Sequence, residues 1–189
     1  MSAGPIARGL ERKFAAGSVV AGGAGTISGY ASLFGAVDLG RDAVIAGAFS
    51  KALAKKGTRG IRMLFQHKPD EPIGAWTAIR EDARGLYVEG TISPDVARGR
   101  EVLALLKGGG LDGLSIGFRT VRARTDAKTG IRQVIEADLW EISVVTFPML
   151  PGARVAAVKA AHAEGDGDLA GTIRRAARRI SIATSKETR

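Results

Sequence analysis

The 189-residue chain contains two histidines, His67 and His162. Histidine is the side chain whose ordinary pKa best suits proton transfer near neutral pH. His67 follows an apolar run that ends at Phe65 and precedes a turn with two prolines, Pro69 and Pro72. If the chain performs acid–base chemistry, His67 is the residue best suited to it.

A serine and a carboxylate further along the chain could complete a hydrolytic site with His67. Ser115 stands between Gly113 and Gly117, whose missing side chains would leave room for a peptide beside the serine hydroxyl. Glu141 lies in an otherwise apolar segment, where a partly buried carboxylate can orient an imidazole and stabilise its protonated form. The three residues therefore suggest a nucleophile, a general base and an orienting acid.

Each of these residues also has a simpler interpretation. Ser115 could be a spacer where another backbone approaches, since no parallel α/β pattern surrounds its Gly-x-Ser-x-Gly spacing. His67 could be a hydrogen-bonded surface residue, and Glu141 could pair with one of the many arginines. Asp138 and Asp38 compete with Glu141 for the role of third member.

The composition excludes several classes of site. The chain has no cysteine, which rules out disulfides and thiolate metal sites, and two distant histidines do not favour zinc. No cofactor or metal is therefore expected. No apolar run approaches the ~20 residues that span a bilayer, so no membrane partner is expected. The net charge of +9 permits contact with nucleic acid, but aromatic residues make up only 5% of the chain, few for a base-stacking surface.

The pattern of apolar residues predicts one domain, mainly β with helices. We expect a flexible segment over 1–17, the domain over 18–160, and a linker with a basic amphipathic tail over 161–189. A helix is expected over 46–57 and another from an N-cap at Ser93 to the glycines at 108–110, and the alanine-rich stretch 153–162 could be helical. The expected strands lie within 18–34 and at 61–66, 73–80, 86–92, 113–124, 131–137 and 138–147. Short strands joined by hairpins favour a closed or nearly closed antiparallel β-barrel decorated by short helices.

Five segments, in this order, resemble the prohead (capsid maturation) serine protease family of tailed phages. The likeness runs from about residue 26 to about residue 158. The segments are GYASLF at 29–34 with Asp38, GAF at 47–49, FQH at 65–67 with PIG at 72–74, GLSIGF at 113–118, and WEISVVTFP at 140–148.

The resemblance implies a fold and a set of site residues. The family is distantly similar in fold to herpesvirus assemblin, a β-barrel serine protease surrounded by helices. The resemblance implies His67 as general base, Ser115 as nucleophile and Glu141 as third member. Assemblin uses a second histidine as its third member, but His162 lies beyond the matched segments. Backbone N–H groups near Ser115, or an arginine such as Arg119 or Arg122, are candidates for stabilising the oxyanion.

The resemblance also implies a function. We expect a serine endopeptidase of capsid maturation that cleaves scaffold-like segments of the major capsid protein, and itself, inside the assembling prohead in the host cytoplasm. The tail over 169–189 is expected to recruit the enzyme, with self-cleavage between about 158 and 170. A homo-oligomer is compatible with this setting. The alternative is a non-catalytic β-barrel that binds the capsid protein or its scaffold segment.

Overall fold

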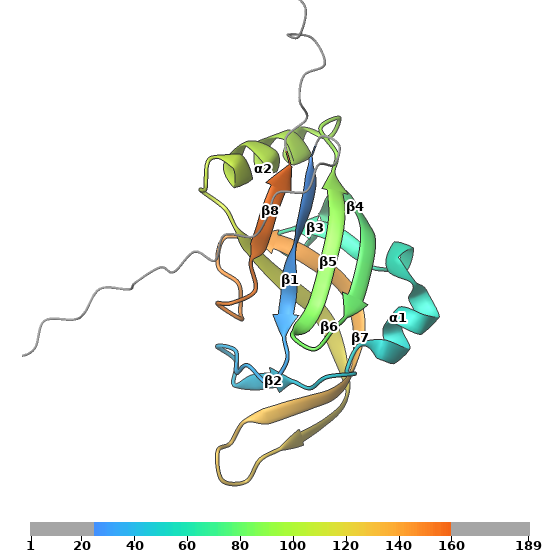
Figure 1. Ribbon diagram of the computed structural model, residues 1–189, viewed down its shortest axis with the longest axis vertical. Helices are drawn as coiled ribbons and strands as arrows, with labels where there is room; N and C mark the ends of the chain where they lie inside the picture. Colours follow the sequence, from blue (N-terminus) through green and yellow to red (C-terminus); the bar gives the residue numbers. More distant parts are fainter. Residues whose placement is uncertain (1–24, 160–189) are drawn as a thin grey trace, which may run out of the picture.

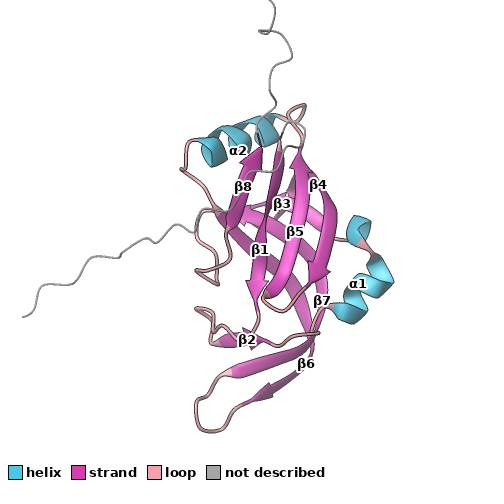
Figure 2. Cartoon of the chain, viewed as in Figure 1, coloured by secondary structure: helices cyan, strands magenta, loops and turns pink. Residues whose placement is uncertain are grey.

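Eight strands form one strongly curled sheet in the described part of the chain, with two short helices packed against it (Figures 1 and 2). The computed structural model describes residues 25–159. The elements in chain order are β1 Thr26–Leu33, β2 Asp42–Val44, α1 Ser50–Lys56, a 3-10 turn Thr58–Gly60, β3 Arg62–Phe65, β4 Lys68–Glu81, β5 Gly85–Ile92, α2 Ala97–Lys107, β6 Gly113–Thr125, β7 Arg132–Val145 and β8 Val155–Lys159.

Strand β7 organises the sheet because three strands pair with it. β6 pairs antiparallel along one edge of β7, from Thr125 opposite Arg132 to Gly113 opposite Val145. On the other edge, β2 pairs with the first residues of β7 and β3 pairs with residues 141–144, both in parallel. The rest of the sheet continues from β3 through β4, β5 and β1 to β8.

The sheet curls until its two ends meet near the start of β6. An isolated bridge joins Gly113 to Arg154, and the N–H of Val155 donates to the carbonyl of Asp112 at 2.8 Å. The expectation of a mainly β, nearly closed fold with short helices is confirmed. The expectation that all pairings are antiparallel is wrong, because β2 and β3 run parallel to β7. Alternation of apolar residues shows which face of a strand is buried, but it does not show which distant strand lies beside it.

Large apolar side chains fill the inside of the curl. Phe49, Ile73, Leu86 and Ile142 are fully buried there, and each such side chain stabilises the fold by about 1.5–3 kcal/mol. Helix α2 crosses one end of the curled sheet (Figure 1) and buries Val102, Leu103 and Leu106 at helical spacing.

Several details of the expected secondary structure differ. The segments 131–137 and 138–147, expected as two strands, form the single strand β7, and β4 begins at Lys68 rather than at residue 73. α2 begins at Ala97, not after an N-cap at Ser93, because the N–H of Ser93 continues the sheet by donating to Ile73 O at 2.8 Å. Residues 155–159 of the alanine-rich stretch form strand β8 along the edge of β1, where tertiary pairing overrides helix propensity. β2 was not expected, since three residues are too few to show a period.

The predicted terminal segments lie outside the described residues. The boundaries at 17 and 160, and the role of the tail, therefore stay predictions. Within residues 25–159, no helix has the length and apolar character needed to cross a bilayer.

Candidate active site

His67 sits in a tight turn with unusual backbone conformation. Phe65 pairs with Lys68, so Gln66 and His67 alone form the turn between β3 and β4. Both have positive φ, 54° for Gln66 and 59° for His67. Two-residue hairpin turns of type I′ require this geometry and normally use Asn or Gly. Non-glycine residues in this region cost about 1 kcal/mol or more each, so the surrounding structure must hold the turn.

The end of strand β7 and the residue after it supply the contacts that hold the turn. The N–H of Gln66 donates to Val144 O at 3.1 Å, and its side-chain amide donates to Thr146 Oγ1 at 2.7 Å. The N–H of His67 donates to Ser143 Oγ at 3.0 Å. These bonds fix the position of the backbone from which the His67 imidazole projects.

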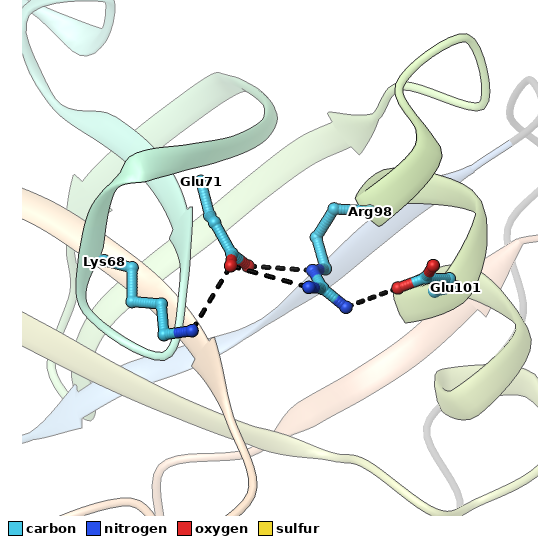
Figure 3. A network of polar contacts seen from close by, with 4 residues as sticks. All are labelled: Lys68, Glu71, Arg98 and Glu101. Atoms are coloured by element: carbon cyan, nitrogen blue, oxygen red, sulfur yellow. Dashed lines mark hydrogen bonds and ion pairs between the residues drawn. The ribbon is translucent and has the colours of Figure 1, made fainter.

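A network of ion pairs fastens the same hairpin to α2 (Figure 3). Glu71 lies 3.3 Å from Lys68 Nζ and accepts a hydrogen bond of 2.8 Å from Arg98 Nε. Arg98 also pairs with Glu101, and its guanidinium lies 5.3 Å from the centre of the Phe65 ring. Arg98 therefore contacts residues on both sides of the His67 turn. Sequence reasoning missed this network because its members come from separate elements.

His67 and Glu141 are in direct contact. His67 Nδ1 lies 2.7 Å from Glu141 Oε1, and Ser143 Oγ donates to Glu141 Oε2 at 2.6 Å. A carboxylate can only accept, so Nδ1 carries the proton and the neutral ring keeps a basic lone pair on Nε2. The Glu141 side chain is 13% exposed, which limits the screening of its charge by water. This is the arrangement of a carboxylate that orients and strengthens a histidine base.

Gly117 makes room for the Glu141 carboxylate. The two residues are cross-strand partners, and a Cβ on Gly117 would lie 2.0 Å from Glu141 Oε1. A Cβ on Gly113 would meet Val145 O at 2.5 Å. The expectation that both glycines leave room for a peptide is therefore wrong. The space at Gly117 is occupied by the Glu141 side chain, and the space at Gly113 is occupied by Val145 O and by side-chain atoms of Val145 and Pro148.

Ser115 lies on the strand next to these residues. It is directly opposite Ser143, so the two serine side chains project from the same face of the sheet. Its side chain forms no hydrogen bond with any described residue, and the residue is 5% exposed. Ser115 also lines a cavity of about 280 Å³. The other lining residues are Ala31, Ser32, Ala36, Asp38, Gly40, Asp42, Val44, Leu114, Ile116, Phe118, Arg132, Met149 and Leu150.

The structure brings His67 and Glu141 into contact. It places Ser115 on β6, which is next to the strand of Glu141 and two strands from β3, the strand that leads into the His67 turn. Ser143 lies between them, bonded to the His67 backbone and to the Glu141 carboxylate. No hydrogen bond joins Ser115 to His67 among residues 25–159. Catalytic hydrogen bonds are often long or unformed without substrate. Sequence reasoning missed Ser143, although two polar residues at positions 141 and 143 of an apolar strand indicate a shared polar face.

The two rival carboxylates do not contact His67. Asp138 lies 2.5 Å from Lys56 Nζ, and this hydrogen bond lowers the pKa of Asp138. Asp38 accepts hydrogen bonds from the N–H groups of Gly40 and Asp42, at 2.8 and 2.9 Å, and so shapes the loop before β2. Asp38 does line the cavity beside Ser115.

Of the two arginines considered for the oxyanion, one is too far away. Arg122 follows Ser115 by seven positions on β6, which is roughly 23 Å along a strand. Arg119 is nearer but is 69% exposed and lies 3.5 Å from Asp138. In the described part of the chain, no group of three or more histidine, aspartate and glutamate side chains could hold a metal ion.

We predict that His67 titrates above the ordinary histidine value of about 6.5. The hydrogen bond with Glu141 raises its pKa, outweighing the partial burial that lowers it. A raised pKa means that the protonated pair stabilises the fold below the unfolded pKa, and that this contribution is lost as pH rises through the folded pKa. NMR titration of the His67 ring measures this value. A pKa at or below 6.5 would contradict the pairing.

A second prediction concerns Gly117→Ala. The added methyl would displace the Glu141 carboxylate from His67, so the pKa of His67 should fall towards its ordinary value and any activity that depends on the pair should drop about 100-fold. NMR titration and a rate assay measure both. Gly110→Ala is the matched control, since a Cβ there meets Leu105 at an ordinary 3.6 Å. An unchanged His67 pKa in Gly117→Ala would show that the contact between Glu141 and His67 does not need the space left by Gly117.

Comparison with known sequences assigns the family. The sequence profile described as caudovirus prohead serine protease matches residues 14–167. The chain belongs to this family. The prohead protease of Enterobacteria phage HK97 is 41% identical over 138 residues, which are 71% of this chain and 60% of that protein. The prohead protease of Escherichia phage T5 is 36% identical over 88 residues, 46% of this chain and 40% of that protein. The chain thus spans less than two thirds of the length of these relatives.

Solved structures support the fold assignment. The capsid assembly protease of bacteriophage T4 matches with a TM-score of 0.55 at 15% identity, over 65% of this chain and 82% of that chain. The KSHV protease bound to a hexapeptide phosphonate inhibitor gives a TM-score of 0.46 at 12% identity, over 69% of this chain and 63% of that chain. This structural similarity is too low to support an inference. The family resemblance predicted from the five sequence segments is confirmed.

Proposed function

We propose that the chain is a serine endopeptidase of capsid maturation, with Ser115 as nucleophile, His67 as general base and Glu141 as the third member. The observation that carries the proposal is the 2.7 Å contact between His67 Nδ1 and Glu141 Oε1, beside the strand that bears Ser115. Membership of the prohead serine protease family agrees with it.

The chemistry follows from these roles. Ser115 Oγ attacks the peptide carbonyl while His67 Nε2 takes its proton, and Glu141 stabilises the imidazolium that forms. His67 then gives the proton to the leaving amine as the C–N bond breaks, which leaves an acyl-enzyme. Water attacks the acyl group with His67 again as base, and Ser115 regains its proton. Ser143 takes no part in bond making, because it is fully buried and its Oγ donates to Glu141.

The proposed substrates are scaffold-like segments of the major capsid protein and the enzyme's own chain. The reaction would take place inside the assembling prohead, in the host cytoplasm. The relatives named above are prohead proteases, which supports this setting.

A fluorophosphonate probe tests the catalytic proposal without knowledge of the substrate. The wild-type chain should be phosphonylated on Ser115, as read by peptide mass spectrometry, and His67→Ala should not react. Co-expression with the capsid protein tests the substrate: the capsid protein should lose mass only with the wild-type enzyme. A capsid protein that binds the chain and keeps its full mass, together with an unlabelled Ser115, would instead identify a non-catalytic binding module.

A further inference from the structure

The β6–β7 hairpin extends away from the curled sheet, at the end opposite α2 (Figure 1). Its outer part, residues 119–133, is called the basic arm here. None of these residues is buried, so the arm adds nothing to the core. A two-stranded ribbon is only marginally stable in water without such support. A contribution to the stability of the fold therefore does not explain why the basic arm is present.

The arm is rigidly braced in spite of its exposure. The side chain of Arg41 donates to Thr129 O at the turn, and the N–H of Arg132 donates to Arg41 O at 3.0 Å. Asp126 caps the turn by accepting from the N–H groups of Lys128 and Thr129, at 2.9 and 2.8 Å. A braced ribbon loses little conformational entropy when it binds a partner.

The arm carries an uncompensated positive charge. It contains five basic residues and one acidic residue: Arg119, Arg122, Arg124, Lys128 and Arg132 against Asp126. Arg132 is neutralised by Asp42, and Arg119 lies 3.5 Å from Asp138. Arg124 donates a hydrogen bond of 2.9 Å to the neutral Gln133, and its charge is partly balanced by Asp126. Within residues 25–159, the side chains of Arg122 and Lys128 have no partner.

The same strand links the arm to Ser115. β6 pairs with β7 along one edge. Its other edge pairs with the described residues only at its start, where Gly113 forms a bridge to Arg154 and the N–H of Leu114 donates to Ala153 O at 2.9 Å. Beyond Leu114 this edge is unpaired in the described part of the chain. The backbone N–H and C=O groups of that free edge can therefore pair with an added strand. Arg119 lies about 13 Å from Ser115 and Arg124 roughly 30 Å from it, at about 3.3 Å per residue.

We propose that the basic arm is an exosite that binds an acidic, extended polypeptide segment and guides the adjoining residues to Ser115. Delivery of the adjoining residues to Ser115 rests on the proposed protease function. Binding of the acidic segment to the arm does not depend on that function. The spacing along β6 places the acidic residues about four to nine positions from the bond that is cut. A polypeptide fits better than a nucleic acid, because the free edge offers strand pairing and residues 119–133 contain no aromatic side chain for base stacking.

Binding to an inactive enzyme tests the exosite. The full-length chain with Ser115→Ala is titrated into a fluorescein-labelled peptide of alternating glutamate and threonine, and anisotropy is recorded at low and high salt. R122E/K128E should weaken binding about tenfold or more at low salt and reduce its salt dependence. R59E/K107E is the matched control, since it makes the same change of charge outside the arm. Both side chains are exposed and have no partner within residues 25–159.

Three outcomes would overturn the exosite. One is that the two double variants weaken binding equally, which would make the effect one of net charge. Another is that short duplex DNA binds more tightly than the peptide and depends on the arm, which would make the arm a nucleic-acid contact. The third is that the peptide does not bind at all, which would leave the arginines as charges that keep an edge strand from pairing.

A kinetic test separates the exosite from the protease proposal. With a cleaved peptide that has an acidic flank, R122E/K128E should raise KM about tenfold and leave kcat unchanged. Labelling of Ser115 by the fluorophosphonate should be unaffected. If R122E/K128E is labelled normally and its KM equals that of the wild-type enzyme, the exosite proposal is refuted and the protease proposal stands. If the wild-type enzyme is not labelled at Ser115, the protease proposal is refuted.

Discussion

Replacing Ser115 by alanine is expected to abolish cleavage of the capsid protein, and replacing His67 by alanine is expected to do the same. Members of one catalytic unit act together, so each loss should be about 10⁴- to 10⁶-fold in kcat and the double variant should be no worse than either single one. The fold should survive, because Ser115 makes no side-chain hydrogen bond to any residue between 25 and 159 and His67 is 42% exposed. Single-turnover cleavage followed by mass spectrometry measures the loss.

The control for this prediction is Ser93→Ala, which removes a hydroxyl with no hydrogen bond to the described residues, at a position whose backbone N–H bonds Ile73 O and not the His67 turn. It should leave the rate unchanged. Circular dichroism of each variant checks that the sheet is intact. Normal cleavage by either single variant would remove that residue from the mechanism, and a double variant much slower than both singles would mean that they act independently.

Most of the strands were predicted because each of them carries its own signal, whereas β2 and β8 were missed. The hairpin of β4 and β5 follows from two alternating runs around a polar loop, and Asp82 does cap that loop by accepting from the N–H groups of Arg84 and Gly85. The end of α2 follows from the run of glycines at 108–110. Such local signals do not depend on which strands become neighbours.

Pairing between distant segments could not be predicted in the same way. The parallel contact of β3 with β7 is what brings the His67 turn to Ser143 and Glu141, yet the paired residues, such as Leu64 and Ser143, are 79 positions apart in the sequence. The role of Gly117 was misread for the same reason. Its missing side chain is explained by a carboxylate on the opposite strand, which is visible only when the register is known.

The types of the candidate residues were easier to identify than their connections. His67 and Glu141 were paired on chemical grounds, and the structure places them in contact. Ser143 was missed because its spacing from Glu141 indicates only a shared polar face and does not show which residues that face contacts. Its importance comes from two bonds, one to the backbone of His67 and one to the side chain of Glu141.

Glu141→Gln is expected to lower kcat about 10³- to 10⁴-fold and to leave measurable residual activity, because a carboxylate that orients and stabilises an imidazole contributes less than the nucleophile. The amide keeps the shape but removes the charge, so the pKa of His67 should fall and the acid limb of the pH–rate profile should move to lower pH. The base must be neutral to act, and a lower pKa keeps it neutral in more acidic solution. Asp138→Asn and Asp38→Asn are the matched controls, since they make the same change at carboxylates that do not contact His67. If Glu141→Gln keeps full activity while either control is inactive, the third member of the site is that aspartate and not Glu141.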